Sequence, residues 1–426
     1  MAQPRAVGVI GAGILGLTAA LRFAQAGMRV TVIEREEEVG GLVASFKIGG
    51  AHLERYYHHL FRSDRDVRAL IAEAGLEHAL VWPRPDVSSL CGGRFYGFDS
   101  PTDVLAFSPL PFADRVRLGA CAAYLKLERN YHRLEGQTAA SWIKRWMGEE
   151  AYQVFWGPLL RAKFGDFAEQ IAMPWFWSRV HLRSQRLGYI RGGFYRLYAR
   201  LAEQLEQSGA EMRLKTEVKS IRSDDSVHVD TSDGAFDFDQ LLVTTPTRVF
   251  MRLAVNLPDE YRSRYDTGEY YGAHSVILGL NRQLMERTYW LNIHDPGFPF
   301  LTVVEHTNFM PASDYDGLHV VYLGNYLPMS DPLLRKPREE VLKEFTSALR
   351  RINPDFDEGW VVESHVFAAP FAQPIVTVDY HEHIPPHETP LRGVYLANMF
   401  QVYPEDRGQN YSVRMANRVA ARMISA

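Results

Sequence analysis

Val7-Gly-Val-Ile-Gly-Ala-Gly-Ile-Leu-Gly16 is the stretch of sequence that decides the fold. A β-branched run leads into Gly11, Gly13 and Gly16, which is the spacing of a dinucleotide-binding turn between a strand and a helix. In such a turn the three glycines permit the bend, the approach of a pyrophosphate and close helix packing, and free N–H groups at the helix start attract phosphate. The expected phosphate contacts are Gly11, Gly13, Ile14, Leu15 and Gly16.

The residues after this turn extend the nucleotide-binding pattern. Residues 29–33 predict a second strand that ends at Glu34, whose carboxylate can accept hydrogen bonds from a ribose diol and repel a 2′-phosphate. Gly40 and Gly41 follow, and a double glycine lets the backbone pass close to a cofactor. The expected contacts of this segment are Glu34, Arg35, Gly40, Gly41 and Leu42.

Composition limits the remaining classes of function. The 426 residues suffice for two domains, and the net charge of −4 offers no electrostatic basis for nucleic-acid binding. Two cysteines form no disulfide framework and no metal-ligand spacing, which is typical of a reducing compartment. His381, His383 and His387 flank Pro385-Pro386, a loop signal, so we expect no metal site.

The start of the chain and its apolar runs bear on localisation. The first strand begins near Ala6, which leaves no room for a signal peptide, and charges interrupt every longer apolar run. Residues 104–127 are apolar with interspersed Arg115, Arg117 and Lys126, a pattern that suits either a core-covering helix or a membrane surface. We therefore expect a cytoplasmic protein, with peripheral contact at the inner face of a membrane left open.

Nucleotide-binding signals recur in three separated segments. The second contains Gly192-Gly193 before a helix over 196–208, then short alternating strands, and the third ends in a strand at 393–398 and a helix over 412–424 capped by Ser412 or Asn410. These segments predict an α/β, doubly wound (Rossmann-like) domain with an inserted α+β substrate domain. The expected cofactor domain comprises 1–85, 187–255 and 385–426, and the substrate domain comprises 86–186, helical and aromatic-rich, and 256–384, rich in strands.

The glycine triad, Glu34 and Gly40-Gly41 together resemble the flavin-containing amine oxidoreductase superfamily. That group includes protoporphyrinogen oxidases, phytoene desaturases and, more distantly, UDP-galactopyranose mutase. The resemblance implies FAD, held in addition by Val218, Thr245, Asn398, Arg407, Gly408, Asn410 and Tyr411. Two departures stand out: Ala397-Asn398 replaces the Gly-Asp of many relatives, and residues 270–300 lack the Lys that monoamine oxidases use.

Candidate reactive residues lie outside the glycine motifs. The polar and aromatic segment 52–64 contains Tyr57, a candidate substrate contact, with His58 and His59 as candidate acids or bases. Glu305 and His306 follow an apolar strand and are further catalytic candidates, with strand alternation sending them to opposite faces. Arg161 and Lys163 are candidates for binding a substrate phosphate.

These features predict an enzyme that takes a hydride from an organic substrate, whether apolar, lipid-linked or an amine. Its partners are that small molecule and an electron acceptor, either oxygen or another compound. Two alternatives remain open: a flavin-dependent isomerase resembling UDP-galactopyranose mutase, with no net redox change, and a non-catalytic FAD-binding protein. The oligomeric state is left undetermined.

Overall fold

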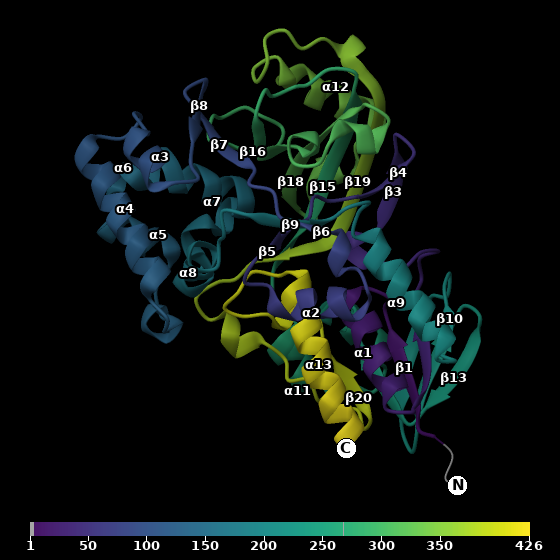
Figure 1. Cartoon of the computed structure of the whole chain (residues 1–426). Coiled ribbons are helices and arrows are strands. Elements are labelled where there is room, and N and C mark those ends of the chain that lie inside the picture. The colour runs from purple at the N-terminus through teal and green to yellow at the C-terminus, as the bar shows by residue number, and fades with distance from the viewer. Residues whose placement is uncertain (1–3, 267) are drawn as a thin grey trace.

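The computed structural model describes residues 4–266 and 268–426 (Figure 1). The opening stretch folds as expected into β1 (Ala6–Ile10), α1 (Ile14–Gln25) and β2 (Arg29–Ile33). β1 is buried throughout, because its β-branched and glycine residues lie in the middle of a sheet.

β1 lies at the centre of a five-stranded parallel sheet in the order β10-β2-β1-β14-β20. The added strands are β10 (Glu211–Arg213), β14 (Gln240–Val243) and β20 (Val394–Leu396). Three distant segments of the chain thus share one sheet, and the expected mixed α/β fold with a parallel sheet is present. Its carboxyl edge is the place where parallel sheets of this kind bind ligands.

Different elements pack on the two faces of this sheet. Val7 and Val9 pack in one core with α1, α9 (Tyr195–Gln207) and α13 (Gln409–Ser425). Ala6 and Ile10 point to the opposite core. That core contains an antiparallel meander and two helices: β11 (Val218–Ser223), β12 (Val227–Thr231), β13 (Gly234–Phe238), α10 (Thr247–Leu253) and α11 (Asp259–Tyr265).

A second, seven-stranded sheet has the order β19-β15-β18-β17-β16-β7-β8 and is antiparallel except between β16 and β7. Val276 and Leu278 on one face pack against α12 (Arg338–Leu349), whereas Ile277 and Tyr322 on the other face join the core of the parallel-sheet region. Its strands are β7 (Asp86–Cys91), β8 (Arg94–Gly97), β15 (Tyr270–Leu280), β16 (Thr288–Ile293), β17 (Thr302–Glu305), β18 (His319–Pro328) and β19 (Val361–Pro374).

A group of helices with its own aromatic core projects beside both sheets (Figure 1). It contains α3 (Pro101–Ala106), α4 (Phe112–Leu127), α5 (Ala139–Trp146), α6 (Glu149–Ala151), α7 (Gly157–Phe164) and α8 (Met173–His181). Short elements connect the three parts: β3 (Ser45–Ile48), β4 (Ala51–Glu54), β5 (Leu60–Phe61), α2 (Arg65–Glu73), β6 (Leu80–Val81) and β9 (Leu187–Ile190).

The structure corrects several local expectations. The segment from residue 86 begins with two strands before its helices, because β7 and β8 complete the seven-stranded sheet. The last helix starts at Gln409 after Gly408, so neither Ser412 nor Asn410 caps it. Cys91 and Cys121 are free thiols. Within the described ranges, no helix is both long and apolar enough to cross a membrane.

Candidate functional site

The glycine turn between β1 and α1 is closed on one side and open on the other. Gly11 has φ +102°, which favours glycine, and a Cβ on Gly16 would lie 1.9 Å from the Gly11 carbonyl oxygen. A Cβ on Gly13, in contrast, would meet no atom within 4 Å. Gly11 thus supplies the bend and Gly16 the close packing, and the open side at Gly13 leaves room for a ligand close to the backbone.

Glu34 is hydrogen-bonded directly to this turn. Its carboxylate accepts hydrogen bonds from the backbone N–H of Ala12 at 2.8 Å and of Glu36 at 3.0 Å. A half-buried acceptor therefore stands at the end of β2 beside the first helical turn. Arg35 instead points to solvent and pairs with Glu36, so its side chain is not directed at the turn.

The second glycine pair lies against the first motif. Gly40 donates a backbone hydrogen bond to the carbonyl of Ala12 at 3.0 Å, and a Cβ on Gly41 would lie 3.4 Å from the Cα of Gly13. Leu42 follows and reaches the wall of a cavity. This segment therefore connects the glycine turn to the interior of the molecule.

The remaining cofactor candidates differ in whether their polar groups already have partners within the protein. Asn398 is buried and binds the Thr245 carbonyl and the Thr247 hydroxyl, and Asn410 accepts hydrogen bonds from the first N–H groups of α2. Both amides are therefore used within the protein. The hydroxyl of Thr245 itself is buried with no partner among the described residues, and Val218 is half-buried at the start of β11. Gly408 precedes α13, whose first turn carries Tyr411.

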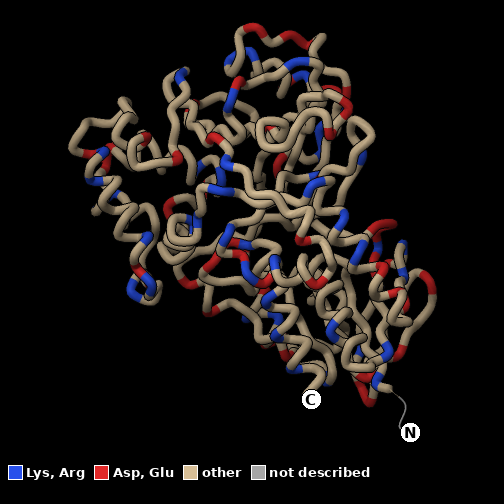
Figure 2. The backbone as a smooth tube through the Cα atoms, in the orientation of Figure 1, with Lys and Arg blue, Asp and Glu red and all other residues tan. Residues whose placement is uncertain are grey.

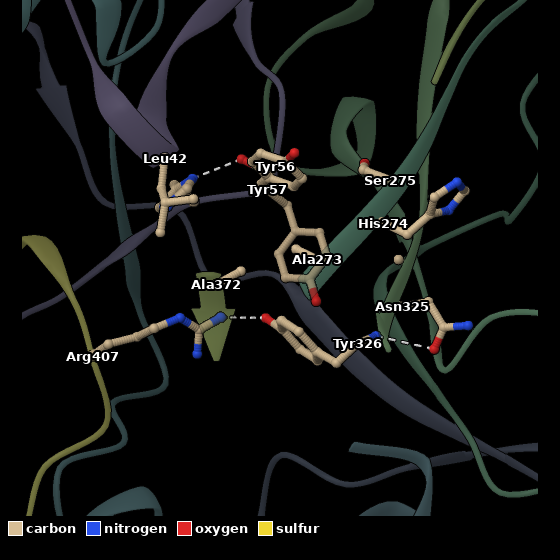
Figure 3. Close-up of a pocket in the computed structure, with 12 residues that line it drawn as sticks. Leu42, Tyr56, Tyr57, Ala273, His274, Ser275, Asn325, Tyr326, Ala372 and Arg407 are labelled. Atoms are coloured by element: carbon tan, nitrogen blue, oxygen red, sulfur yellow. Dashed lines mark hydrogen bonds between the residues drawn. The ribbon is translucent and has the colours of Figure 1, made fainter. Parts of the chain in front are cut away.

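A small cavity of about 60 Å³ lies where the parallel-sheet region meets the seven-stranded sheet (Figure 3). Its walls come from residues 56–58, from 273–275 of β15, from 324–326 of β18, and from Leu42, Ala372 and Arg407. Segments far apart in the sequence thus enclose one space, with Leu42 of the nucleotide-binding segment on its wall.

Two tyrosines project into this cavity (Figure 3). The Arg407 guanidinium donates a 2.6 Å hydrogen bond to the Tyr326 hydroxyl, and Tyr57 lines the same cavity. Although burial opposes ionisation, Arg407 and Lys163 hold the pKa of Tyr326 below its ordinary value. The pKa of Tyr57 is raised by burial, so the two hydroxyls have different acidities.

The two neighbouring histidines have different surroundings. His58 lines the cavity, and its Nδ1 lies 2.7 Å from the Tyr56 carbonyl oxygen. Because a carbonyl only accepts, Nδ1 carries the proton and Nε2 is unprotonated. Burial lowers the pKa of His58 to about 4 and that of His59 to about 3, so both rings are neutral at pH 7. His59 packs on Trp290 outside the cavity wall.

Glu305 and His306, the other two catalytic candidates, lie outside the wall of this cavity. Glu305 is fully buried and accepts hydrogen bonds from the backbone N–H groups of Leu284 and Met285. His306 Nε2 lies 2.7 Å from the Tyr315 hydroxyl, and its ring is also buried. The strand ends at Glu305 and a 3₁₀ turn follows, so strand alternation does not separate the two side chains as we expected.

Arg161 and Lys163 are also separated by the fold. Arg161 is exposed on α7, whereas Lys163 points inward, where its ammonium forms an ion pair with Asp406 at 3.3 Å. Lys163 Nζ also lies 5.4 Å from the ring centroid of Tyr326. Lys163 therefore adjoins the cavity and Arg161 does not.

Sequence reasoning did not identify Tyr326, Arg179 or Asp406. Arg179 forms a 3.1 Å ion pair with Asp406, and the neighbouring Glu405 pairs with Arg414. Tyr326 lies on an apolar strand and Arg179 in an aromatic helix, and neither position carries a pattern that marks a site. Asp406 was visible only as the neighbour of Arg407.

Comparisons with known proteins agree with this geometry. A family model described as flavin containing amine oxidoreductase matches residues 15–423. Phytoene desaturase of Fusarium fujikuroi is 25% identical over 262 residues, which are 52% of this chain and 44% of that enzyme. The chain thus spans less than half the length of this curated relative.

Solved structures share the fold over the whole chain. A protein from Exiguobacterium sp. 255-15, named provisionally as a protoporphyrinogen oxidase, superposes with a TM-score of 0.81 at 19% identity over 100% of both chains. Reduced UDP-galactopyranose mutase superposes with a TM-score of 0.79 at 16% identity, over 99% of this chain and 98% of that chain. At such identities the likeness concerns the fold alone.

Proposed function

The chain belongs to the flavin-containing amine oxidoreductase family, and we propose that it is an FAD-dependent oxidoreductase. Its substrate would be an organic small molecule held in the central cavity between residues 56–58 and strands β15 and β18. The observation that carries this proposal is the continuity from Gly13 through Gly41 and Leu42 to the cavity wall. Bound FAD supplies the hydride acceptor, and the electrons then pass to oxygen or another acceptor.

The residues present fit FAD. The open space at Gly13 admits a pyrophosphate, and the carboxylate of Glu34 suits a ribose diol. The unpartnered hydroxyl of Thr245 at the end of β14 is a polar group that a ligand can satisfy. We propose that Gly11, Gly13, Ile14, Leu15, Gly16 and Glu34 hold the ADP half, Val218 flanks the adenine, and Gly40, Gly41, Leu42, Thr245, Arg407, Gly408 and Tyr411 hold the flavin half.

The same proposal divides the chain into two domains. Residues 1–85, 187–255 and 385–426 would form a doubly wound FAD domain, and residues 86–186 and 256–384 the substrate domain. The strand order β10-β2-β1-β14-β20 supports this division, because the order reverses at β1 and leaves a crevice at the carboxyl edge.

Around the substrate, the protein's own groups would position it and accept a proton. His58 Nε2 is an unprotonated acceptor on the cavity wall, and the hydroxyls of Tyr57 and Tyr326 offer hydrogen bonds. Because the pKa of His58 is about 4, His58 stays neutral over the physiological range and would act as a hydrogen-bond acceptor more readily than as a strong base.

One measurement tests this function. The purified holoenzyme is bleached anaerobically with dithionite and mixed with oxygenated buffer while the flavin absorbance is followed. Fast recovery of the oxidised bands supports an oxidase, and slow recovery supports an oxidoreductase with another acceptor. Protein that shows no flavin bands and does not bind added FAD would contradict the proposal.

A flavin-dependent isomerase is the second candidate. The cationic groups near the cavity, Lys163, Arg179 and Arg407, favour it, because they suit an anionic substrate that is rearranged without net oxidation. Turnover that requires prior reduction of the flavin, yet consumes no reductant, would identify this activity and exclude net oxidation.

We further propose peripheral contact with a membrane through α4. Eleven large hydrophobic residues are exposed in the described part of the chain, and seven of them lie between Phe95 and Trp146. Phe112, Val116 and Leu127 follow helical spacing on the solvent side of α4, opposite the buried Leu118 and Leu125. An apolar stripe of this kind suits insertion at the boundary of headgroups and acyl chains.

A further inference from the structure

Three basic side chains surround a single carboxylate at one end of the central cavity. Asp406 lies 3.3 Å from Lys163 Nζ, 3.1 Å from Arg179 Nη1 and 3.6 Å from Arg407 Nη1. The three cations come from α7, α8 and the segment before α13, so only the tertiary fold brings them together.

The charges in this cluster do not balance. Asp406 is one negative charge against three positive ones, and Lys163, Asp406 and Arg407 are each no more than 18% exposed. Although burial opposes ionisation of Asp406, the three cations hold its pKa below the usual range. Burial, together with Arg179 and Arg407, lowers the pKa of Lys163 to about 8, although Asp406 acts in the opposite direction. Unbalanced charge at a desolvated site is costly unless a counter-ion joins it.

The cluster also has access to the cavity and to solvent. Arg407 and Tyr326 line the cavity, and Lys163 lies against the ring of Tyr326. Arg179 is 45% exposed, so its guanidinium marks the outer end. Arg407 thus faces the cavity directly, and Lys163 lies next to it against the Tyr326 ring.

We propose that Lys163, Arg179 and Arg407 form an anion-binding subsite for an oxyanion group, either phosphate or carboxylate, of the substrate. Asp406 holds the three cations in place and leaves two positive charges for the ligand. The guanidinium groups offer paired N–H donors and the ammonium a point charge, a combination that suits oxygen-rich anions. This inference rests on the proposed function and names the substrate class of that site.

The test titrates the oxidised holoenzyme with pyrophosphate, and in a second arm with malonate, at constant ionic strength, because salt screens exposed charges. Binding is followed by the difference spectrum of the flavin and by tryptophan fluorescence. Lys163→Gln and Arg179→Gln are compared with Arg161→Gln, the exposed arginine of the same helix α7 that carries Lys163.

We expect saturable binding that weakens at least tenfold, about 1.4 kcal/mol, in Lys163→Gln and Arg179→Gln and remains unchanged in Arg161→Gln. Preference for pyrophosphate or malonate identifies the phosphate or the carboxylate as the recognised group, and either one supports the subsite. Absence of saturable binding up to about 10 mM, or equal loss in Arg161→Gln, would overturn it.

Two controls keep this test decisive. Arg179 is partly exposed, so its substitution preserves the fold even where Lys163→Gln perturbs packing. Flavin content and reducibility are measured on every variant. A protein that binds and reduces FAD normally but ignores both anions contradicts only the subsite, whereas loss of FAD binding contradicts the proposed function itself.

Discussion

Gly13 and Gly16 have opposite environments although they stand three residues apart. The Gly13 backbone has φ −75°, which any residue adopts, and its side faces open space. Gly16 faces the Gly11 carbonyl so closely that a methyl group cannot be accommodated. The two positions therefore separate the binding of a cofactor from the folding of the turn.

This contrast yields a prediction for Gly13→Ala. We expect a normally folded protein whose FAD affinity is at least tenfold weaker, about 1.4 kcal/mol, because the added methyl group occupies the space of the pyrophosphate. Isothermal titration of the apoprotein with FAD measures this. Gly119→Ala on α4, also free of neighbours within 4 Å, is the matched control. Unaltered FAD affinity in Gly13→Ala would show that the phosphates lie elsewhere.

Glu54 predicts a pH dependence of stability. Its carboxylate accepts hydrogen bonds from the Tyr189 hydroxyl at 2.7 Å and the Phe194 N–H at 2.6 Å, and burial raises its pKa from 4.5 to about 7. Between these two pH values the folded chain retains a proton that the unfolded chain loses. The stabilisation is therefore complete below pH 4.5 and is lost as pH rises through about 7.

Glu54→Gln removes this titration. We expect the difference in melting temperature, Glu54→Gln minus wild type, to be several degrees larger at pH 8 than at pH 5. The reason is that a shift of one pKa unit corresponds to about 1.4 kcal/mol of stability. Calorimetry at both pH values measures the difference. The exposed Glu206→Gln on α9 provides the baseline. A difference that is constant with pH would mean that Glu54 titrates normally.

At the scale of elements, α4 is unusual because it is apolar on two sides. Leu118 and Leu125 face the helical core, while Phe112, Val116 and Leu127 face solvent with exposures of 66%, 47% and 78%. Charged residues of both signs are spread along the chain (Figure 2). α4 itself carries Asp114, Arg115, Arg117 and Lys126 beside its exposed apolar side chains.

For this stripe we predict binding to vesicles of mixed neutral and anionic phospholipid. Val116→Asp with Leu127→Asp should lower the vesicle-bound fraction in a flotation assay at least tenfold, since each buried side chain contributes about 1.5–3 kcal/mol. Val362→Asp, which replaces a 60% exposed valine on β19, should have no effect. Equal flotation of all three proteins, or none by the wild type, would refute membrane contact through α4.

At the scale of the whole molecule, the cofactor region links the two ends of the chain. α1 packs on α13, and the parallel sheet joins strands from residues 6 to 396. A ligand that spans the glycine turn and the start of α13 would bind only the assembled form. Its binding therefore adds to the stability of the fold by mass action.

Removal of FAD should lower the melting temperature by several degrees. A ligand at about 100 times its Kd adds about 2.7 kcal/mol to the stability of the folded state. Differential scanning calorimetry of apoprotein with added FAD or FMN measures this. FMN keeps one phosphate but lacks the AMP portion of FAD, whose phosphate and ribose the Gly13 and Glu34 region is expected to bind, so it should restore less. Equal restoration by both would contradict binding of the ADP half at the glycine turn.

The local nucleotide-binding elements could be predicted because they depend on short-range patterns. β1 begins at Ala6 and β2 spans Arg29–Ile33 as expected, and Glu34 and Gly40-Gly41 lie at the glycine turn. The positions of the candidates that depend on contacts between distant residues could not be predicted in this way. Glu305, His306 and Arg161 lie away from the cavity, whereas Tyr326 and Arg179 were not identified.

The sequence alone determined the glycine turn, the family and the cofactor. The spacing of Gly11, Gly13 and Gly16 and the strand before it are constraints within about ten residues, and steric and hydrogen-bonding rules act locally there. Only the tertiary structure decided which side chains line the cavity and which cations surround Asp406. Lys163 and Arg179 lie on two helices and Arg407 in the segment before α13. Their approach depends on how sheets and helices pack, which is a long-range outcome that no local pattern records.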